Sequence, residues 1–269
     1  MEDVMTLAVP NETFRAVALS ALLLFAALFV WQLASTPSGG GRTQGLPGPA
    51  AVATVTWEML SEPFYDRGPN DKGIGFQVLS SLGRVAIGYS LASVVAIFLG
   101  VILGLNPILL KAANPYIQIL KPISPLAWMP LFLYTIKDAT GAMILVIFMS
   151  TLWPTLANTA FGVSAIKRDY LNVAALLQLS WWGRFFKVIL PAAAPTIVAG
   201  LRISIGSAWV AVVAAEMLVG GTGIGYFVWN EWNNLSLTRV MFAILVIGVV
   251  GLILDAGFTR LARAIAYIE

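Results

Sequence analysis

Six long apolar segments constrain this chain more than any other feature of its sequence. They run over 14–34, 76–105, 115–136, 139–166, 192–219 and 240–256. At about 1.5 Å per residue, a helix of about 20 residues crosses the roughly 30 Å hydrocarbon core of a bilayer. Only 11% of the residues are charged, whereas a soluble domain carries about 25%. We therefore expect one all-α integral membrane domain over 1–269, with six transmembrane helices.

The first apolar segment could be a signal peptide or a retained span. The apolar run at 14–34 is long for a signal peptide, and residues 36–39 make a poor cleavage site. We expect the segment to remain as the first span. The stretch 35–75 is rich in glycine and proline and carries charges of both signs, so it is predicted to be an outer loop. Within it, 50–60 can form a surface helix.

Charge distribution predicts the orientation. An even number of spans puts both termini on one side, and basic residues are enriched on the cytoplasmic side of membrane proteins. The five basic residues on the proposed outer side are Arg42, Arg67, Lys72, Lys137 and Arg239. The nine on the proposed inner side are Arg15, Lys111, Lys121, Lys167, Arg168, Arg184, Lys187, Arg260 and Arg263. Both termini and the stretch 167–191 are therefore predicted to be cytoplasmic.

Prolines interrupt the third segment, 115–136, at Pro122, Pro125 and Pro130. Each proline removes a backbone donor and leaves a carbonyl without its helical partner. At membrane depth, such a carbonyl is tolerated only where protein or a water-filled cavity receives it. The segment can therefore line a transport path or be a kinked packing helix. The stretch before it, 106–114, is predicted to be a short inner turn.

The chain contains no cysteine and no histidine. This excludes disulfides and thiolate chemistry and removes the usual metal ligand and general base. The glycine-rich stretch 220–225 lacks the lysine of a phosphate-binding loop, so a hinge or a close-packed turn is its predicted role. The net charge is +3, and the basic residues form no cluster of the kind that binds nucleic acid. We expect this chain to bind no cofactor and to hydrolyse no ATP itself.

A charged stretch at 167–191 is the longest break in the apolar pattern of the C-terminal half. Basic residues stand at both ends, and 172–179 between them combines helix formers with apolar side chains. Pro191 and Pro195 then mark the start of a new helix. The stretch can be an ordinary loop, or a short amphipathic helix that docks into a groove of a soluble partner.

The spacing of this stretch resembles the EAA loop of ABC-importer permeases. In that motif, Glu-Ala-Ala is followed at fixed distances by glycine, isoleucine and proline. Ala174-Ala175, Ile189 and Pro191 fall at the expected positions. Val173 and Leu179 stand where the family usually has glutamate and glycine. The resemblance implies a coupling helix whose contact residues are Asn172, Val173, Ala174, Ala175, Leu176, Gln178, Leu179 and Pro191.

The resemblance covers most of the chain, from 46 to 263. The stretches 46–49, 81–89, 124–130 and 200–204 are similar to permeases of the nitrate, bicarbonate, sulfonate and taurine importers. The stretches 214–225 and 229–234 are most similar to the nitrate branch. The resemblance therefore implies the type I ABC-importer permease fold and the import of a small anion across the bacterial inner membrane.

The same resemblance implies a set of partners. These are a second permease copy, two cytoplasmic ATPase subunits that bind ATP and Mg²⁺, an outer solute-binding protein or domain, the anion and membrane lipid. Nitrate is the expected substrate, and bicarbonate, cyanate, nitrite and sulfonates such as taurine are alternatives. An ATP-independent channel or secondary transporter is a second reading, although no inverted repeat is evident. An integral-membrane enzyme is a third, although histidine and cysteine are absent.

Three of the charged residues within predicted spans are singled out as functional candidates, because charges are costly at membrane depth. Arg84 and Glu216 lie at matching depth, so a buried ion pair is favoured over a role in the pathway. Arg202 has no predicted acidic partner at its depth; it either snorkels to the inner interface or supplies positive potential to an anion path. Four further side chains can line or gate a path or simply pack: Tyr89, Trp128, Met129 and Trp209.

Overall fold

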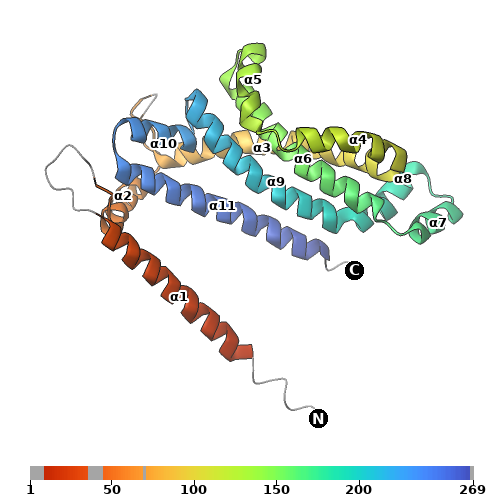
Figure 1. The fold of residues 1–269 in the computed structure, drawn as a ribbon, viewed down its shortest axis with the longest axis horizontal. Helices are drawn as coiled ribbons and strands as arrows, with labels where there is room; N and C mark the ends of the chain where they lie inside the picture. Colours follow the sequence, from red (N-terminus) through yellow and green to blue (C-terminus); the bar gives the residue numbers. More distant parts are fainter. Residues whose placement is uncertain (1–8, 36–44, 69–70, 267–269) are drawn as a thin grey trace, which may run out of the picture. The chain divides into compact units, whose positions relative to one another are not determined.

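The computed structural model describes residues 9–35, 45–68 and 71–266. This part of the chain is helical apart from turns and an isolated bridge between Asp66 and Lys72. The helices (Figure 1) are α1 (Val9–Ala34), α2 (Pro49–Ser61), α3 (Ile74–Leu105), α4 (Pro107–Leu120), the 3-10 helix η1 (Pro125–Trp128), α5 (Met129–Ile136), α6 (Ala139–Ser164), α7 (Arg168–Leu176), α8 (Trp181–Arg184), the π-helix η2 (Phe185–Ile189), α9 (Leu190–Val219), α10 (Ile224–Asn233) and α11 (Leu237–Ala266).

Five helices among the described residues are long and apolar enough to cross a bilayer. They are α1, α3, α6, α11 and the continuous helix Trp181–Val219, which comprises α8, η2 and α9. A sixth crossing is formed if α4 and the helix Pro125–Ile136 act as one span, and these two are bent by 83°. Five of the six predicted spans are therefore present as continuous helices among the described residues. The predicted surface helix at 50–60 is α2.

The region 106–136 corrects two predictions. The stretch 106–114 is predicted to be a turn, but α4 already begins at Pro107. Asn106 explains this start, because its side-chain oxygen accepts the backbone N–H groups of Ile108 and Leu109 at 3.0 and 3.2 Å and so caps the helix. The predicted span 115–136 is broken after α4, where prolines prevent the helix from continuing.

The chain divides into two compact units, 1–62 with 231–242 and 63–230 with 243–269. In the described part of the first unit, the Trp31 indole N–H donates to the Pro47 carbonyl at 2.9 Å. Glu231 and Arg239 form an ion pair at 3.6 Å in the same unit. The second unit contains α3 to α9 and carries the candidate site.

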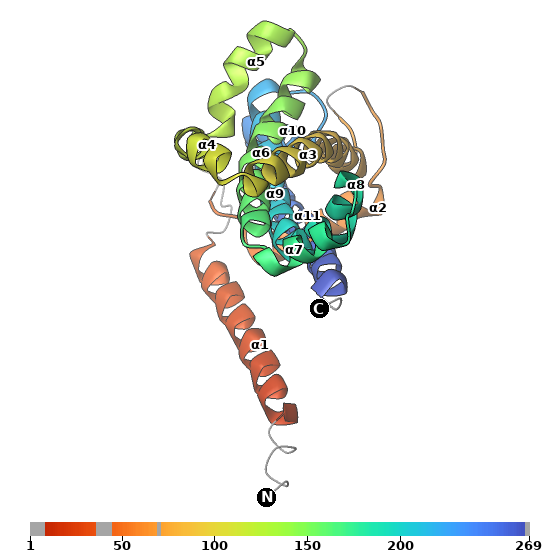
Figure 2. The ribbon, with the colours of Figure 1, turned by 90° about the vertical axis from the view of Figure 1, so that its right-hand side faces the viewer.

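The second unit is built on α3, α6 and α9, which pack side by side in both views (Figures 1 and 2). A residue without a bulky side chain recurs every fourth position along α3: Gly88, Ala92, Ala96, Gly100 and Gly104. A Cβ added to any of the three glycines would collide with α6. Small residues at this spacing let two membrane helices approach closely, so this stripe sets the α3–α6 contact.

Buried apolar side chains fill the space between these helices in separate clusters. One cluster joins α5, α6 and α9 and comprises Met129, Ala142, Met143, Val146, Ala211 and Ala215. Another joins α3, α6, η2 and α9 and comprises Val101, Val163, Ile189, Ala193 and Ile197. The clusters fix α9 along its length, so a displacement at one end of α9 is transmitted through packed side chains.

Candidate functional site

The helix α7 lies at one end of the α3–α6–α9 bundle (Figure 1). It differs from the predicted helix 172–179, because it begins at Arg168 and ends at Leu176. Gln178 adopts a left-handed backbone conformation with φ of 48°, which stops the helix. Gln178 and Leu179, both predicted coupling residues, therefore lie in the turn after α7.

Most apolar side chains of α7 and its turn face outward. Tyr170, Val173, Leu176 and Leu177 are exposed, and Leu176 is 82% exposed. Of the two alanines of α7, Ala174 is buried and Ala175 is exposed. A hollow of about 800 Å³ lies between this segment and the start of α9. Exposed apolar surface of this kind makes the segment a candidate interaction site.

The helix before α9 carries a ladder of four aromatic rings. Trp181 stacks on Phe185 with centroids 5.7 Å apart, and Trp182 stacks on Phe186 with centroids 6.1 Å apart. Trp181, Trp182 and Phe186 are exposed, and Arg184 and Lys187 lie on the same short segment. Aromatic and basic side chains in this combination favour the membrane–water interface.

A π-helical turn joins this aromatic segment to α9. The Leu190 N–H donates to the Phe185 carbonyl, one residue further back than in an α-helix. Pro191 has no N–H to offer the Lys187 carbonyl, so a regular α-turn cannot form here. The predicted new helix does begin here, with Pro191 in the first turn of α9, but it continues a helix that starts at Trp181. Turns of this type bend helices and occur at functional sites.

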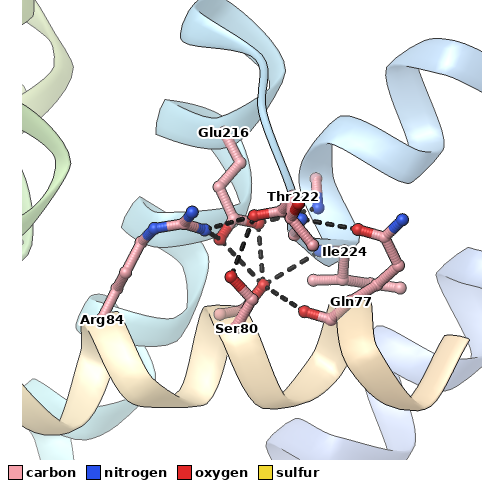
Figure 3. Close-up of polar contacts among 9 residues, drawn as sticks. Gln77, Ser80, Arg84, Glu216, Thr222 and Ile224 are labelled. Carbon is pink, nitrogen blue, oxygen red and sulfur yellow. Dashed lines mark hydrogen bonds and ion pairs between the residues drawn. The ribbon is translucent and has the colours of Figure 1, made fainter. Parts of the chain in front are cut away.

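The predicted ion pair between α3 and α9 is present. Arg84 Nη1 lies 2.6 Å from Glu216 Oε1 and also donates to the Thr222 carbonyl at 2.6 Å (Figure 3). The Glu216 side chain is fully buried, and that of Arg84 is 12% exposed. The matching depths that the sequence indicated therefore correspond to a direct contact.

Hydroxyl and backbone donors complete the surroundings of Glu216. Ser81 Oγ lies 2.8 Å from both carboxylate oxygens. The same hydroxyl accepts the Ile224 N–H at 2.9 Å, and the Gly225 N–H donates to Glu216 Oε2 at 3.0 Å. We call Gln77, Ser80, Ser81, Arg84, Glu216 and the loop 220–225 the polar clamp.

The polar clamp holds the loop after α9 onto the first turns of α3. The Gly223 N–H donates to Gln77 Oε1 at 2.6 Å, and Ser80 Oγ donates to the Thr222 carbonyl at 3.1 Å (Figure 3). A Cβ added to Gly223 would overlap the Glu216 carboxylate. The glycine-rich stretch is thus a close-packed turn, as the sequence predicts.

Arg202 corrects a prediction, because it has an acidic partner. Its Nε and Nη2 atoms donate to Asp255 Oδ1 and Oδ2 at 2.7 and 2.8 Å. The pair links α9 to α11, and its side chains are 44% and 49% exposed within the chain. The sequence placed Asp255 at the inner end of a span 240–256. The helix α11 continues to Ala266, so Asp255 lies well inside it, level with Arg202.

The four predicted pathway side chains make packing contacts. The Trp209 indole N–H donates to the Ile247 carbonyl at 3.0 Å, and the Tyr89 hydroxyl donates to the Leu201 carbonyl at 3.0 Å. Met129 is buried in the cluster of α5, α6 and α9. The Trp128 ring stacks on Phe132 with centroids 6.3 Å apart.

A metal centre is not formed by the residues that the structure describes, since no three acidic side chains gather where they could hold an ion. What the geometry offers is a bundle of membrane helices with a bent pair on its side. An outward-facing apolar helix lies between two long helices. These features define an all-helical integral membrane protein.

Comparison with known proteins gives the family. Residues 93–267 match the family described as the binding-protein-dependent transport system inner membrane component. This chain belongs to that family, and it is a permease subunit of an ABC importer.

Two curated relatives extend the match over nearly the whole chain. "Nitrate import permease protein NrtB" of Synechocystis sp. is 41% identical over 260 residues, which is 97% of this chain and 89% of the relative. "Bicarbonate transport system permease protein CmpB" of the same organism is 44% identical over 242 residues, which is 89% and 85% of the two chains.

Among solved structures, a chain of the MetNI methionine ABC transporter in an inward-facing conformation is similar, with a TM-score of 0.62. The match covers 70% of this chain and 94% of that one, at 15% sequence identity. This likeness concerns the fold alone, which is that of a type I ABC-importer permease.

Proposed function

We propose that this permease carries a small inorganic oxyanion inward across the inner membrane. Nitrate is the first candidate and bicarbonate the second. The supporting observation is that relatives at 41% and 44% identity carry names for nitrate and bicarbonate import. Both ions are small, planar and monovalent. The sequence stretches at 214–225 and 229–234 favour the nitrate branch. Cyanate, nitrite and sulfonates are further candidate substrates, ranked after nitrate and bicarbonate.

Energy reaches the chain through partners in this proposal. Two copies of the permease form the path, two cytoplasmic ATPase subunits bind ATP and Mg²⁺, and an outer solute-binding protein or domain selects the anion. Both termini and α7 then lie in the cytoplasm. The chain itself needs no catalytic residue and no cofactor, because its task is to move helices in response to the ATPases.

The helix α7 is the proposed contact with an ATPase subunit. Its apolar side chains are exposed in the chain alone, and an apolar helix face fits a hydrophobic groove of a partner. Ala175 faces outward and Ala174 faces inward, so the two alanines separate docking from folding. The π-helical turn before Pro191 is the proposed hinge through which α7 moves α9.

The Arg202–Asp255 pair is proposed to face the anion path or the second copy rather than lipid. Charged side chains that are half exposed at membrane depth are costly in hydrocarbon. Arg202 uses two of its five N–H donors on Asp255, so the others remain for a passing anion. The pair has no net charge, which permits contact with the anion without trapping it.

The test is ATP-dependent uptake of labelled nitrate and bicarbonate by the permease reconstituted with its ATPase and solute-binding partners. Ala175→Glu should abolish uptake while the permease still inserts, and Ala175→Ser is the matched control that should keep uptake. Full uptake and full anion-stimulated ATPase activity with Ala175→Glu would contradict docking through α7. Uptake of bicarbonate but not nitrate would assign the chain to the second substrate.

A further inference from the structure

A cleft opens where the bent span turns, at the break between α4 and η1. Its volume is about 590 Å³, and three elements form its walls: the bend itself, α6 and α9. The polar side chains among its lining residues are Lys121, Ser124, Ser150 and Ser207. Carboxylates are absent from the lining, which otherwise consists of apolar residues, prolines and a glycine.

The depth of this cleft makes Lys121 unusual. Ser150 lies near the middle of α6 (Ala139–Ser164), and Ser207 lies near the middle of α9 (Leu190–Val219). Lys121 lines the same cleft, so its side chain is at the level of the middle of two membrane-spanning helices. The sequence counted Lys121 among the inner basic residues, and the structure corrects this. Without Lys121 the inner side keeps eight basic residues against five, so the predicted orientation is unchanged.

A cation at this depth calls for a functional explanation. Charged residues within membrane-spanning segments usually pair with each other or mark a path for ions. Arg84 and Arg202 are paired with Glu216 and Asp255. Lys121, by contrast, has no ion-pair partner among the residues that the structure describes, and no acidic residue lines its cleft.

We propose that this cleft is a resting site for the transported anion, with Lys121 supplying positive charge and the Ser124 hydroxyl supplying a donor. The hydroxyls of Ser150 and Ser207 donate to the carbonyls of Ile147 and Ile203 at 3.2 and 3.3 Å, and each can rotate to donate to the anion instead. The proposal deepens the proposed function and rests on it. A monovalent anion that leaves water needs donors and positive potential in place of its hydration shell. This set offers both, and it excludes cations because nothing in the lining carries negative charge.

The size of the cleft indicates weak, hydrated binding. Water takes up roughly 30 Å³ per molecule, so a cleft of about 590 Å³ holds a small oxyanion together with several waters. An ion that keeps part of its hydration shell is held loosely and can leave again, which transport requires. The exposed residues Gly206 and Val210 of α9 lie in the same lining, so the cleft is accessible from outside the bundle.

The experiment removes and restores the charge of Lys121 in the assembled transporter. Lys121→Met should lower ATP-driven nitrate uptake by roughly ten-fold or more, since a hydrogen bond to a charged group is typically worth that much. Lys121→Arg should keep much of it. Lys111→Met is the matched control and should behave like the parent, because Lys111 lies on α4, which ends directly before Lys121, and is not among the residues that line the cleft.

The absence of cysteine from the chain allows a direct test of charge. Lys121→Cys introduces a single thiol, which aminoethyl methanethiosulfonate converts to a cationic side chain and sulfonatoethyl methanethiosulfonate to an anionic one. The cationic reagent should restore uptake and the anionic reagent should not. The parental permease treated with both reagents controls for thiols in the partner subunits. Restoration by charge, and not by bulk, is a result that a packing role of Lys121 would not produce.

The serine variants and the other outcomes complete the test. Ser207→Ala should also slow uptake, but its effect should be several-fold smaller than that of Lys121→Met. Ser164→Ala, outside the cleft, is its control. Parental uptake rates with Lys121→Met, or equal effects of the two reagents, would overturn the site. Failure of both Lys121→Met and Lys121→Arg to assemble would also overturn it, because Lys121 would then be structural. A parental transporter that carries neither nitrate nor bicarbonate would instead overturn the proposed function.

Discussion

Two arginine–carboxylate pairs join long helices of the same bundle, but their surroundings are opposite. The Glu216 side chain is fully buried beside Arg84, whereas the side chains of Arg202 and Asp255 are 44% and 49% exposed. Glu216 receives further hydrogen bonds from Ser81 and the Gly225 N–H. The carboxylate of Asp255, by contrast, is held by Arg202 in a two-pronged contact.

The difference separates a structural pair from one that can take part in transport. A buried pair is costly to break, because the remaining charge has no solvent to receive it. Arg84 and Glu216 therefore fix the loop 220–225 onto α3. A half-exposed pair can exchange partners with ions or water at small cost, so Arg202 can meet an anion without unfolding its surroundings.

The largest effect on stability is expected from Glu216→Leu. It leaves Arg84 buried without its partner, at a cost of roughly 3–5 kcal/mol. Adding Arg84→Met should restore much of the folded yield, because no unpaired charge then remains. Thermal unfolding in detergent, followed by tryptophan fluorescence, measures both variants. A double variant no more stable than the weaker single one would show that the residues are not energetic partners.

A smaller loss is expected from Gly223→Ala, which pushes a methyl group against the Glu216 carboxylate. Overpacking of this kind costs about 1–3 kcal/mol. Gly221→Ala is a close control, since Gly221 also has a positive φ, of 100°, but open space around its Cβ position. The contrast between the two in unfolding temperature isolates the collision. Equal losses would mean that backbone strain, and not the polar clamp, requires the glycine.

Ser80→Ala removes one neutral hydrogen bond of the polar clamp, that between Ser80 Oγ and the Thr222 carbonyl. A loss of about 1 kcal/mol is expected. The same substitution at Ser164, which bonds only within its own helix turn, should change stability less. If Ser80→Ala is neutral in the same unfolding assay, the loop 220–225 is held by Ser81, Gln77 and Glu216 without its help.

The smallest effect on stability is expected from Arg202→Gln, because both partners are half exposed and an exposed ion pair contributes little to stability. Its effect on transport is expected to be large: Arg202→Gln should lose most anion uptake, while Arg202→Lys keeps part of it because the charge persists. Unfolding and uptake are measured on the same preparations. A stable Arg202→Gln permease with parental uptake would make the pair a helix–helix contact alone.

The sequence determined the elements and some of their pairings. Apolar length predicted the spans, because a helix must satisfy its own backbone in lipid. Matching depth predicted the Arg84–Glu216 pair, since a lone charge there is costly. Asn106 followed by Pro107 is a helix-start signal that could have shown α4. The recurrence of small residues from Gly88 to Gly104 could likewise have shown the face that α3 turns to α6.

Tertiary structure decided what lies beside what across the bundle. Asp255 lies level with Arg202 because α11 continues to Ala266. The predicted span ended at 256, because a span predicted from apolar length stops where charged residues begin, and this placed Asp255 at the inner end of the span. Lys121 reaches the middle of α6 and α9 because the bent span turns by 83°, an angle that prolines permit but do not fix. The sequence gives the charge of a side chain directly. Its depth in the membrane and its ion-pair partner depend on how neighbouring helices pack.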